Sequence, residues 1–173
     1  MTTTEITTAH LRLVLNTREK VLAQVDAMSP SDRAQVSPAW LSAAMAAGAP
    51  DPWIHGFAIF DRATGATIGK CGFKGPPTSD GRVEIAYGVD EAYRERGYAT
   101  EAALGLTGYA FTAGGVQVVQ AHTLPEESAS TRVLRKSGFR YVGEIVDPED
   151  GLVWRWEATC DASYQAVTSR SKF

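Results

Sequence analysis

Residues 93–100, of sequence YRERGYAT, combine two arginines with a glycine just before a run of helical spacing. Small and apolar residues recur every three or four positions from Ala99 to Ala110, which predicts a helix that starts here. A loop that enters a helix presents free backbone N–H groups and the positive end of the helix dipole, and both attract anions. Gly97 lets the backbone approach a ligand closely, while Arg94 and Arg96 add positive charge. The segment therefore predicts a diphosphate site, with a plain helix start and solvated arginines as the alternative.

Two titratable side chains lie in the strands predicted on either side of that helix. Glu84 interrupts the apolar run of residues 83–89, and His122 ends the run of residues 118–122. A carboxylate inside an apolar strand faces either a cleft or solvent, and burial in a cleft would raise its pKa toward a value useful to a general base. An imidazole, with an ordinary pKa of about 6.5, suits the same work. Glu84 and His122 are therefore alternative candidates for a base; a solvated carboxylate and a structural histidine are the plainer interpretations.

The elements that must position these residues are predicted from apolar spacing and turn residues. Strands are expected over residues 10–15, 56–60, 66–73, 83–89, 118–122, 139–145 and 152–157, and helices are expected to start near Asn16, Ser37, Ala99 and Ser128. Turn residues at 61–65 and 147–151 join neighbouring strands into two antiparallel hairpins. This order predicts an α/β (α+β) protein with a central sheet flanked by helices.

Two motifs in this order resemble a known family. Arg94-x-x-Gly97-x-Ala99 is similar to the R/Q-x-x-G-x-G/A loop of the GCN5-related N-acetyltransferase (GNAT) superfamily, and residues 125–139 resemble the P-E-N-x-A-S…V-L-x-K-x-G-F signature of its ribosomal-protein-acetyltransferase-like branch. The resemblance covers roughly residues 8 to 158 and implies the GNAT fold, a mostly antiparallel mixed sheet that splays between its fourth and fifth strands. We therefore expect a GNAT domain over residues 1–158 and a polar tail over residues 159–173.

The resemblance also implies an activity, the transfer of acetyl from acetyl-CoA to a primary amine by direct attack in a ternary complex. The acceptor would be a protein N-terminus or a small molecule, and no metal is expected. Glu84 would be the base with His122 as the alternative, Ser130 would be the nearest candidate acid, and Gly88 would form a β-bulge. The residues expected to bind acetyl-CoA are Ala86, Tyr87, Gly88, Val89, Arg94, Glu95, Arg96, Gly97, Tyr98, Ala99, Thr100, Glu127 and Ser130.

Two positions depart from the family pattern. Glu127 stands where the branch usually has Asn, which places a carboxylate near the expected thioester end of acetyl-CoA, and Leu134 stands where many members have a tyrosine acid. These departures keep open a second interpretation, a non-catalytic module that binds acyl-CoA. A third is a transferase for another donor such as succinyl-CoA, for which Lys74 would supply a cation.

Composition bounds the remaining function classes. The 173 residues carry 17 Lys and Arg against 20 Asp and Glu, a net charge of −3, so no overall basic field exists to hold nucleic acid. No apolar run approaches the roughly 18 residues of a membrane span, and the start lacks the pattern of a signal peptide, so a cytoplasmic protein is expected. The two cysteines, Cys71 and Cys160, are too far apart to indicate a zinc cluster or a disulfide scaffold. The resemblance leaves a homodimer open.

Overall fold

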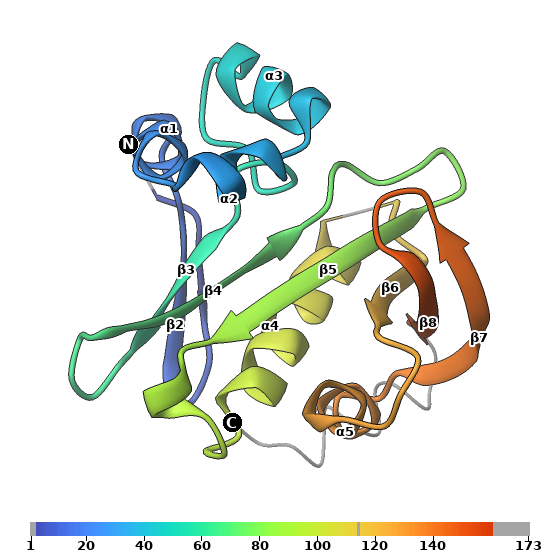
Figure 1. Cartoon of the computed structure of the whole chain (residues 1–173). Helices are drawn as coiled ribbons and strands as arrows, with labels where there is room; N and C mark the ends of the chain where they lie inside the picture. The colour runs from blue at the N-terminus through green and yellow to red at the C-terminus, as the bar shows by residue number, and fades with distance from the viewer. Residues whose placement is uncertain (1–2, 114, 161–173) are drawn as a thin grey trace.

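The computed structural model describes residues 3–113 and 115–160 (Figure 1). Its elements in chain order are β1 (Glu5–Thr7), β2 (Leu11–Leu15), α1 (Arg18–Asp26), α2 (Pro30–Ala34), α3 (Pro38–Ala46), β3 (Phe57–Asp61), β4 (Thr67–Phe73), β5 (Arg82–Val89), the 3₁₀ turn η1 (Glu91–Tyr93), α4 (Tyr98–Thr112), β6 (Val118–Thr123), α5 (Ala129–Lys136), β7 (Arg140–Asp147) and β8 (Gly151–Thr159). Every strand and helix expected from the spacing is present. Strand β1 and helix α2, with three and five residues, were not expected, because elements this short carry no periodicity. Most of the predicted tail, from residue 161 on, lies outside the described residues.

The strands form one sheet in the order β1-β2-β3-β4-β5-β6-β8-β7. Neighbouring strands are antiparallel except β5 and β6, which are parallel. The parallel pairing extends only from Arg82↔Val118 to Glu84↔Gln120, although β5 continues to Val89 and β6 to Thr123. The two strands therefore diverge into a V beyond Glu84 (Figure 1). This confirms the predicted splay; because β1 adds a strand at the start, the splayed pair is the fifth and sixth rather than the fourth and fifth.

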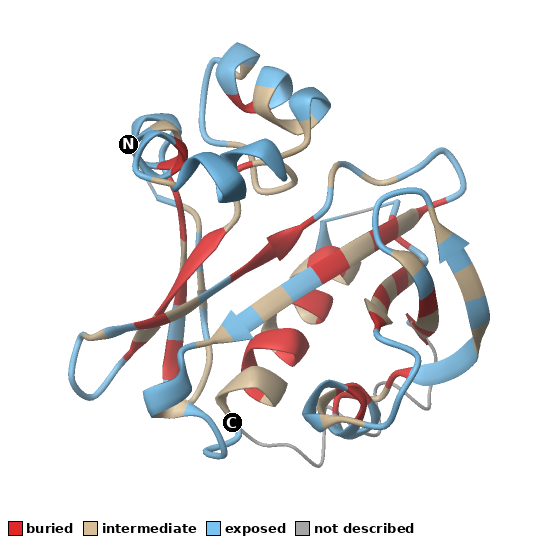
Figure 2. Cartoon of the chain, viewed as in Figure 1, coloured by how far each residue is buried: buried red, intermediate tan, exposed pale blue. Residues whose placement is uncertain are grey.

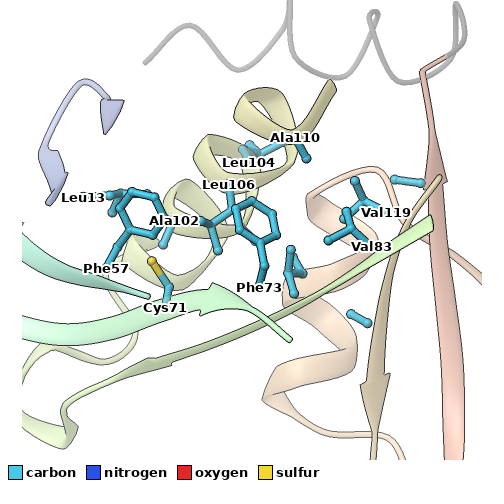
Figure 3. Packing of buried hydrophobic residues seen from close by; sticks show 14 of the residues in the cluster. Leu13, Phe57, Cys71, Phe73, Val83, Ala102, Leu104, Leu106, Ala110 and Val119 are labelled. Carbon is cyan, nitrogen blue, oxygen red and sulfur yellow. The ribbon is translucent and has the colours of Figure 1, made fainter. Parts of the chain in front are cut away.

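Helix α4 covers one face of the sheet and encloses the core with it (Figures 2 and 3). The ring of Tyr109 on α4 lies 6.2 Å from that of Phe57 and 6.1 Å from that of Phe73, and the Phe73 ring lies 4.6 Å from that of Trp53. Burial of each large apolar side chain contributes about 1.5–3 kcal/mol. Cys71 is buried in the same cluster, and burial raises the pKa of its thiol, as expected of a core residue rather than a nucleophile.

The predicted bulge at Gly88 is wrong. Pairing between β4 and β5 runs without a register shift from Phe73↔Ile85 to Gly69↔Val89. The close approach of the two strands is instead accommodated in β4, because a β-carbon at Gly69 would overlap the carbonyl oxygen of Gly88. A glycine on the facing strand, rather than an extra residue in β5, keeps the ladder regular up to the end of β5.

Candidate active site

Glu84 and His122 lie on the same face of the sheet, away from α4. On β5, Val83 and Ile85 are buried in the core while Glu84 points to the opposite face. Glu84 is in register with Gln120, two residues before His122 on β6, so the two side chains are diagonal neighbours. The two residues that the sequence offered as alternative bases are therefore brought together.

A hydrogen-bonded chain fixes the His122 ring. Its Nδ1 atom lies 2.9 Å from Oε1 of Glu84, and the Nε atom of Arg155 on β8 donates to its Nε2 atom at 3.2 Å. Because a guanidinium only donates, Nε2 must accept, and the ring hydrogen sits on Nδ1 and is donated to Glu84. The lone pair of His122 is thus occupied by Arg155, which leaves Glu84 as the group with free capacity to accept a proton.

Lys74 supplies a cation at the same carboxylate oxygen. Its Nζ atom lies 3.3 Å from Oε1 of Glu84 and 3.5 Å from Oδ2 of Asp150 in the turn between β7 and β8. Burial lowers the pKa of the Lys74 ammonium, but the two carboxylates outweigh burial and raise the pKa above its ordinary value. The protonated Lys74 therefore forms an ion pair with Glu84. Both polar contacts of Glu84 involve Oε1, and Oε2 has no hydrogen-bond partner within the described residues, so it can receive a ligand proton.

The edge of β5 that faces the V presents backbone groups of only some of the predicted residues. The N–H of Lys74 donates to the carbonyl of Glu84, and the N–H of Asp90 donates to the carbonyl of Ile68. In an antiparallel ladder the direction alternates, so Ala86 and Gly88 direct their N–H groups toward β4, and Tyr87 and Val89 direct theirs toward the V. The backbone of Tyr87 and the N–H of Val89 therefore offer the unpaired edge, whereas the carbonyl of Val89 accepts from Arg94. Ala86 and Gly88 offer small side chains on the cleft face.

Residues 94–100 form a loop with an exposed helix start at the end of β5. Gly97 precedes α4 with φ +81°, and Glu95 adopts φ +63°, a left-handed conformation that is uncommon for a residue with a side chain. The first backbone bond of α4 is from Glu101 N–H to Gly97 O at 3.0 Å, so the N–H groups of Tyr98, Ala99 and Thr100 have no partner within the helix.

The surroundings of this loop suit an anion. A β-carbon at Gly97 would meet nothing within 4 Å, which shows open space above the helix start. Arg94 donates from Nε to the carbonyl of Val89 at 3.1 Å, and the guanidinium of Arg96 lies 5.6 Å from the ring centroid of Tyr93. Free N–H groups, a helix dipole and two arginines are the features that hold a pyrophosphate.

The carboxylate of Glu127 is not a free charge, because it forms an ion pair. Arg135 donates to its two carboxylate oxygens at 2.7 and 2.6 Å, and the hydroxyl of Thr131 donates at 3.0 Å. The hydrogen bonds from Arg135 and then from Thr131 lower the pKa of Glu127 to about 2. The carboxylate that replaces the family Asn is therefore ionised and balanced by a neighbouring cation.

The structure does not bring Ser130 to the Glu84–His122 pair. Ser130 is exposed on the first turn of α5, and no hydrogen bond joins it to either residue in the described part of the chain. Leu134, at the family tyrosine position, is 1% exposed and belongs to the core.

Two residues of the site were not predicted from the sequence. They are Arg155, which donates to His122, and Asp150, which pairs with Lys74.

A cleft of about 990 Å³ opens on the sheet face that carries Glu84. Its walls come from α1, α3 and the segment before β3, and its floor from β3, β4 and β5. The cleft reaches Ala86, which neighbours Glu84 on the same face of β5. A ligand in the cleft can therefore place a group beside Glu84.

Comparisons with known proteins identify the family of the chain. The family model described as acetyltransferase (GNAT) domain matches residues 4–140. A Bacillus licheniformis protein, named uncharacterized N-acetyltransferase p20, is 32% identical over 93 residues, which are 54% of this chain and 52% of the relative. The chain thus spans about half the length of the curated relatives it matches.

Solved structures share the fold. RimL, a ribosomal L7/L12 α-N-protein acetyltransferase in complex with coenzyme A, has a TM-score of 0.67 and 16% identity, over 92% of this chain and 99% of that chain. RimJ of Mycobacterium smegmatis, in complex with a CoA disulfide, has a TM-score of 0.65 and 16% identity, over 98% and 93% of the two chains. In the ranges 3–113 and 115–160, no helix combines the length and apolar character of a membrane span, and no cluster of three His, Cys, Asp or Glu side chains is arranged for a metal.

Proposed function

Because this chain belongs to the GNAT acetyltransferase family, we propose that it transfers an acetyl group from acetyl-CoA to a primary amine. The observation that carries the proposal is the position of Glu84, held by His122, Arg155 and Lys74 at the point where β5 and β6 diverge. A carboxylate with a free oxygen at the end of a substrate cleft is suited to take a proton from an amine. The proposed domain is residues 1–158.

Acetyl-CoA would bind along the V as a substrate. The N–H groups of Tyr98, Ala99 and Thr100 would hold the pyrophosphate, with Gly97 leaving room and Arg94, Glu95 and Arg96 shaping the loop. The pantetheine would add to the open edge of β5 at Tyr87 and Val89, as a strand adds to a sheet. Glu127 and Ser130, at the start of α5, would border the other side of the V.

The reaction follows from this arrangement. The acceptor ammonium gives a proton to Glu84, and the neutral amine then forms a bond to the thioester carbon. A backbone N–H at the β5 edge stabilises the negative charge that develops on the carbonyl oxygen. The carbon–sulfur bond breaks, and the second proton of the nitrogen reaches the thiolate through solvent. His122 and Lys74 hold the Glu84 carboxylate in place. Leu134 supplies no hydroxyl to protonate the thiolate.

Two contacts weigh against the alternative functions. Lys74 is engaged by Glu84 and Asp150, so it is not free to bind the carboxylate of a succinyl group. The Glu127 carboxylate is balanced by Arg135, so its charge does not argue for a module that has lost turnover. The formation of a homodimer remains a prediction. Light scattering on the purified protein would measure its mass and so test this prediction.

The test of the proposal has two stages. Calorimetric titration with acetyl-CoA, CoA and succinyl-CoA measures binding, and thiol release with a panel of peptides and small amines then measures turnover. We expect micromolar binding of acetyl-CoA and CoA, with turnover for at least one amine. Folded protein that binds no acyl-CoA would refute the proposal, and binding without turnover of any amine would favour the binding-module alternative.

A further inference from the structure

Glu101 is the first residue of α4 that is buried. Residues 94–97 of the preceding loop are exposed and residues 98–100 of the helix are half-buried, whereas Glu101 is only 4% exposed. Its backbone N–H closes the first turn of the helix on the carbonyl of Gly97. Glu101 is therefore the first point at which α4 is anchored in the interior, directly after the free N–H groups of residues 98–100.

The turn between β1 and β2 binds the carboxylate of Glu101. Its Oε1 atom accepts from the backbone N–H of His10 at 2.7 Å and from the hydroxyl of Thr8, and its Oε2 atom lies 3.1 Å from Nδ1 of His10. A buried carboxylate is costly unless hydrogen bonds satisfy it, and hydrogen bonds to a charged group are about twice as strong as those between neutral groups. These contacts therefore join the first turn of α4 firmly to a segment about 90 residues earlier in the chain.

The turn that holds Glu101 is itself fixed by other contacts. The N–H of Thr8 donates to the carbonyl of Leu11 at 2.9 Å, and the N–H of Leu11 donates to the hydroxyl of Thr8 at 3.1 Å. Arg62, the residue after β3, donates from Nη1 to the carbonyls of Thr8 at 2.6 Å and Ala9 at 2.9 Å. The donors to Glu101 are thus held in place by β2 and by the end of β3.

Gly105, one helical turn after Glu101, lets α4 lie close to β1 and β2. A β-carbon at Gly105 would lie 3.3 Å from side-chain carbons of Leu13 and Thr8, closer than ordinary van der Waals contact. A larger residue would push the helix away from these strands and the Glu101 carboxylate away from its donors. This observation is independent of the hydrogen bonds, and it indicates that the distance between α4 and the turn is specified at this point.

Resting on the proposed binding of acetyl-CoA, we propose that Glu101 is a positioning residue for this substrate. Its carboxylate holds the first turn of α4 on the turn of residues 8–10 and so directs the free N–H groups of residues 98–100 at the diphosphate. Hydrogen bonds weaken steeply when the donor is misaligned, and donors fixed before binding lose less entropy when the ligand arrives. The negative charge of Glu101 by itself repels a diphosphate, so its benefit to binding comes from its hydrogen bonds.

Two substitutions of Glu101 separate its hydrogen bonds from its charge. Glu101→Ala removes every contact with the turn, whereas Glu101→Gln keeps an oxygen that accepts from Thr8 and His10 and removes only the charge. We expect Glu101→Ala to raise the Kd for CoA by about tenfold or more, because the first turn loses its alignment, and Glu101→Gln to stay close to the wild type. Calorimetric titration with CoA measures both, and urea unfolding reports the stability of each variant.

Substitutions of Thr8 alter the same contact without a change in α4. Thr8→Val keeps the shape of the side chain and removes the hydroxyl that donates to Glu101, whereas Thr8→Ser keeps the hydroxyl. Thr8→Val should raise the Kd for CoA severalfold and Thr8→Ser should not, and this pair tests the proposal even if Glu101→Ala does not fold. Leu106→Ala is the control, because it opens a cavity under the same helix and should lower stability without a change in the Kd for CoA.

Kinetics distinguishes positioning from a general loss of structure. In Glu101→Ala, KM for acetyl-CoA should rise while kcat at saturating acetyl-CoA stays close to the wild-type value. The kcat/KM for S-acetylpantetheine, a donor without the diphosphate, should not change. A Kd for CoA that Glu101→Ala and Thr8→Val leave unchanged, or that Leu106→Ala raises equally, would overturn the role of Glu101 and leave acetyl transfer intact. Wild-type protein that binds no CoA would overturn both.

Discussion

The Nδ1 atom of His122 lies 2.9 Å from Oε1 of Glu84, and this contact joins β5 to β6 where their pairing ends, at Glu84 and Gln120. Strands that separate lose their backbone hydrogen bonds, so side chains must hold the vertex of the V together. The hydrogen bond from Arg155 extends this connection to β8, and the ion pair with Lys74 extends it to the residue that follows β4. The same contacts that close the vertex also orient the carboxylate that the proposed reaction needs.

Replacement of Glu84 by Gln should lower kcat by about 10²- to 10⁴-fold, the usual contribution of a general base. The deficit should be largest below neutral pH, where the acceptor is an ammonium, and should shrink above pH 8, because an α-amino group with a pKa of about 7.7–8.0 then loses its proton in solution. The measurement is the pH profile of thiol release, together with the Kd for CoA, which should not change. Glu19→Gln, at an exposed carboxylate on α1, is the control. A kcat equal to that of the wild type at every pH would remove Glu84 from the role.

Replacement of His122 distinguishes a base from a positioning residue. The side-chain amide nitrogen of Asn matches the position of the imidazole Nδ1, so His122→Asn keeps the donor to Glu84, whereas His122→Ala removes it. We expect His122→Ala to lower kcat by about tenfold or more, and His122→Asn to stay within a few-fold of the wild type. Steady-state kinetics at saturating acetyl-CoA measures both. If Asn is as inactive as Ala, the imidazole itself carries the proton.

The sequence predicts what contiguous residues determine. The helix start at Gly97, the strand of residues 83–89 and the splay all follow from local spacing and from the family motifs, and the structure has them. The contacts of His122 and Lys74 with Glu84, and of Arg155 with His122, depend on the register between strands, which local spacing does not determine. Arg155 lies between Trp154 and Trp156 and looks like an ordinary strand residue in the sequence. Its role becomes visible only when β8 is paired with β6, which places Arg155 opposite His122.

Other contacts join residues too distant in sequence for spacing to reveal. Glu101 on α4 is buried and accepts from the backbone N–H of His10 at 2.7 Å and from the hydroxyl of Thr8, which ties the turn between β1 and β2 to the start of α4. His55 is buried and accepts at Nδ1 from the backbone N–H of Asp51 at 2.8 Å. A turn residue such as Asp150 shows its role only when the hairpin is placed beside Lys74.

Protonation of Glu127 should weaken the native state in a defined pH range. Its pKa falls from an ordinary 4.5 to about 2 in the folded chain, so the Arg135 pair stabilises the fold fully above about pH 4.5 and not at all below about pH 2. The difference in Tm between the wild type and Glu127→Gln should therefore be largest at pH 6 and decrease between pH 4.5 and 2. The pair is exposed, so the difference will be small and will decrease with added salt. Thermal unfolding without acetyl-CoA measures it, with Glu126→Gln as the control; a difference that grows on acidification would contradict the assignment.

Gly97→Val tests the helix start as the pyrophosphate site. Gly97 and Gly65 both have positive φ, +81° and +74°, and a β-carbon at either would meet nothing within 4 Å. Valine therefore imposes similar backbone strain at the two positions, about 1–2 kcal/mol. Gly65 lies in the turn between β3 and β4, away from the V, so Gly65→Val should lower stability and leave CoA binding unchanged. Gly97→Val should lower stability by a similar amount and also raise the Kd for CoA by at least tenfold, because the added methyl groups occupy the space of the diphosphate. Calorimetry and urea unfolding separate the two effects; equal CoA affinity in the two variants would show that the diphosphate binds elsewhere.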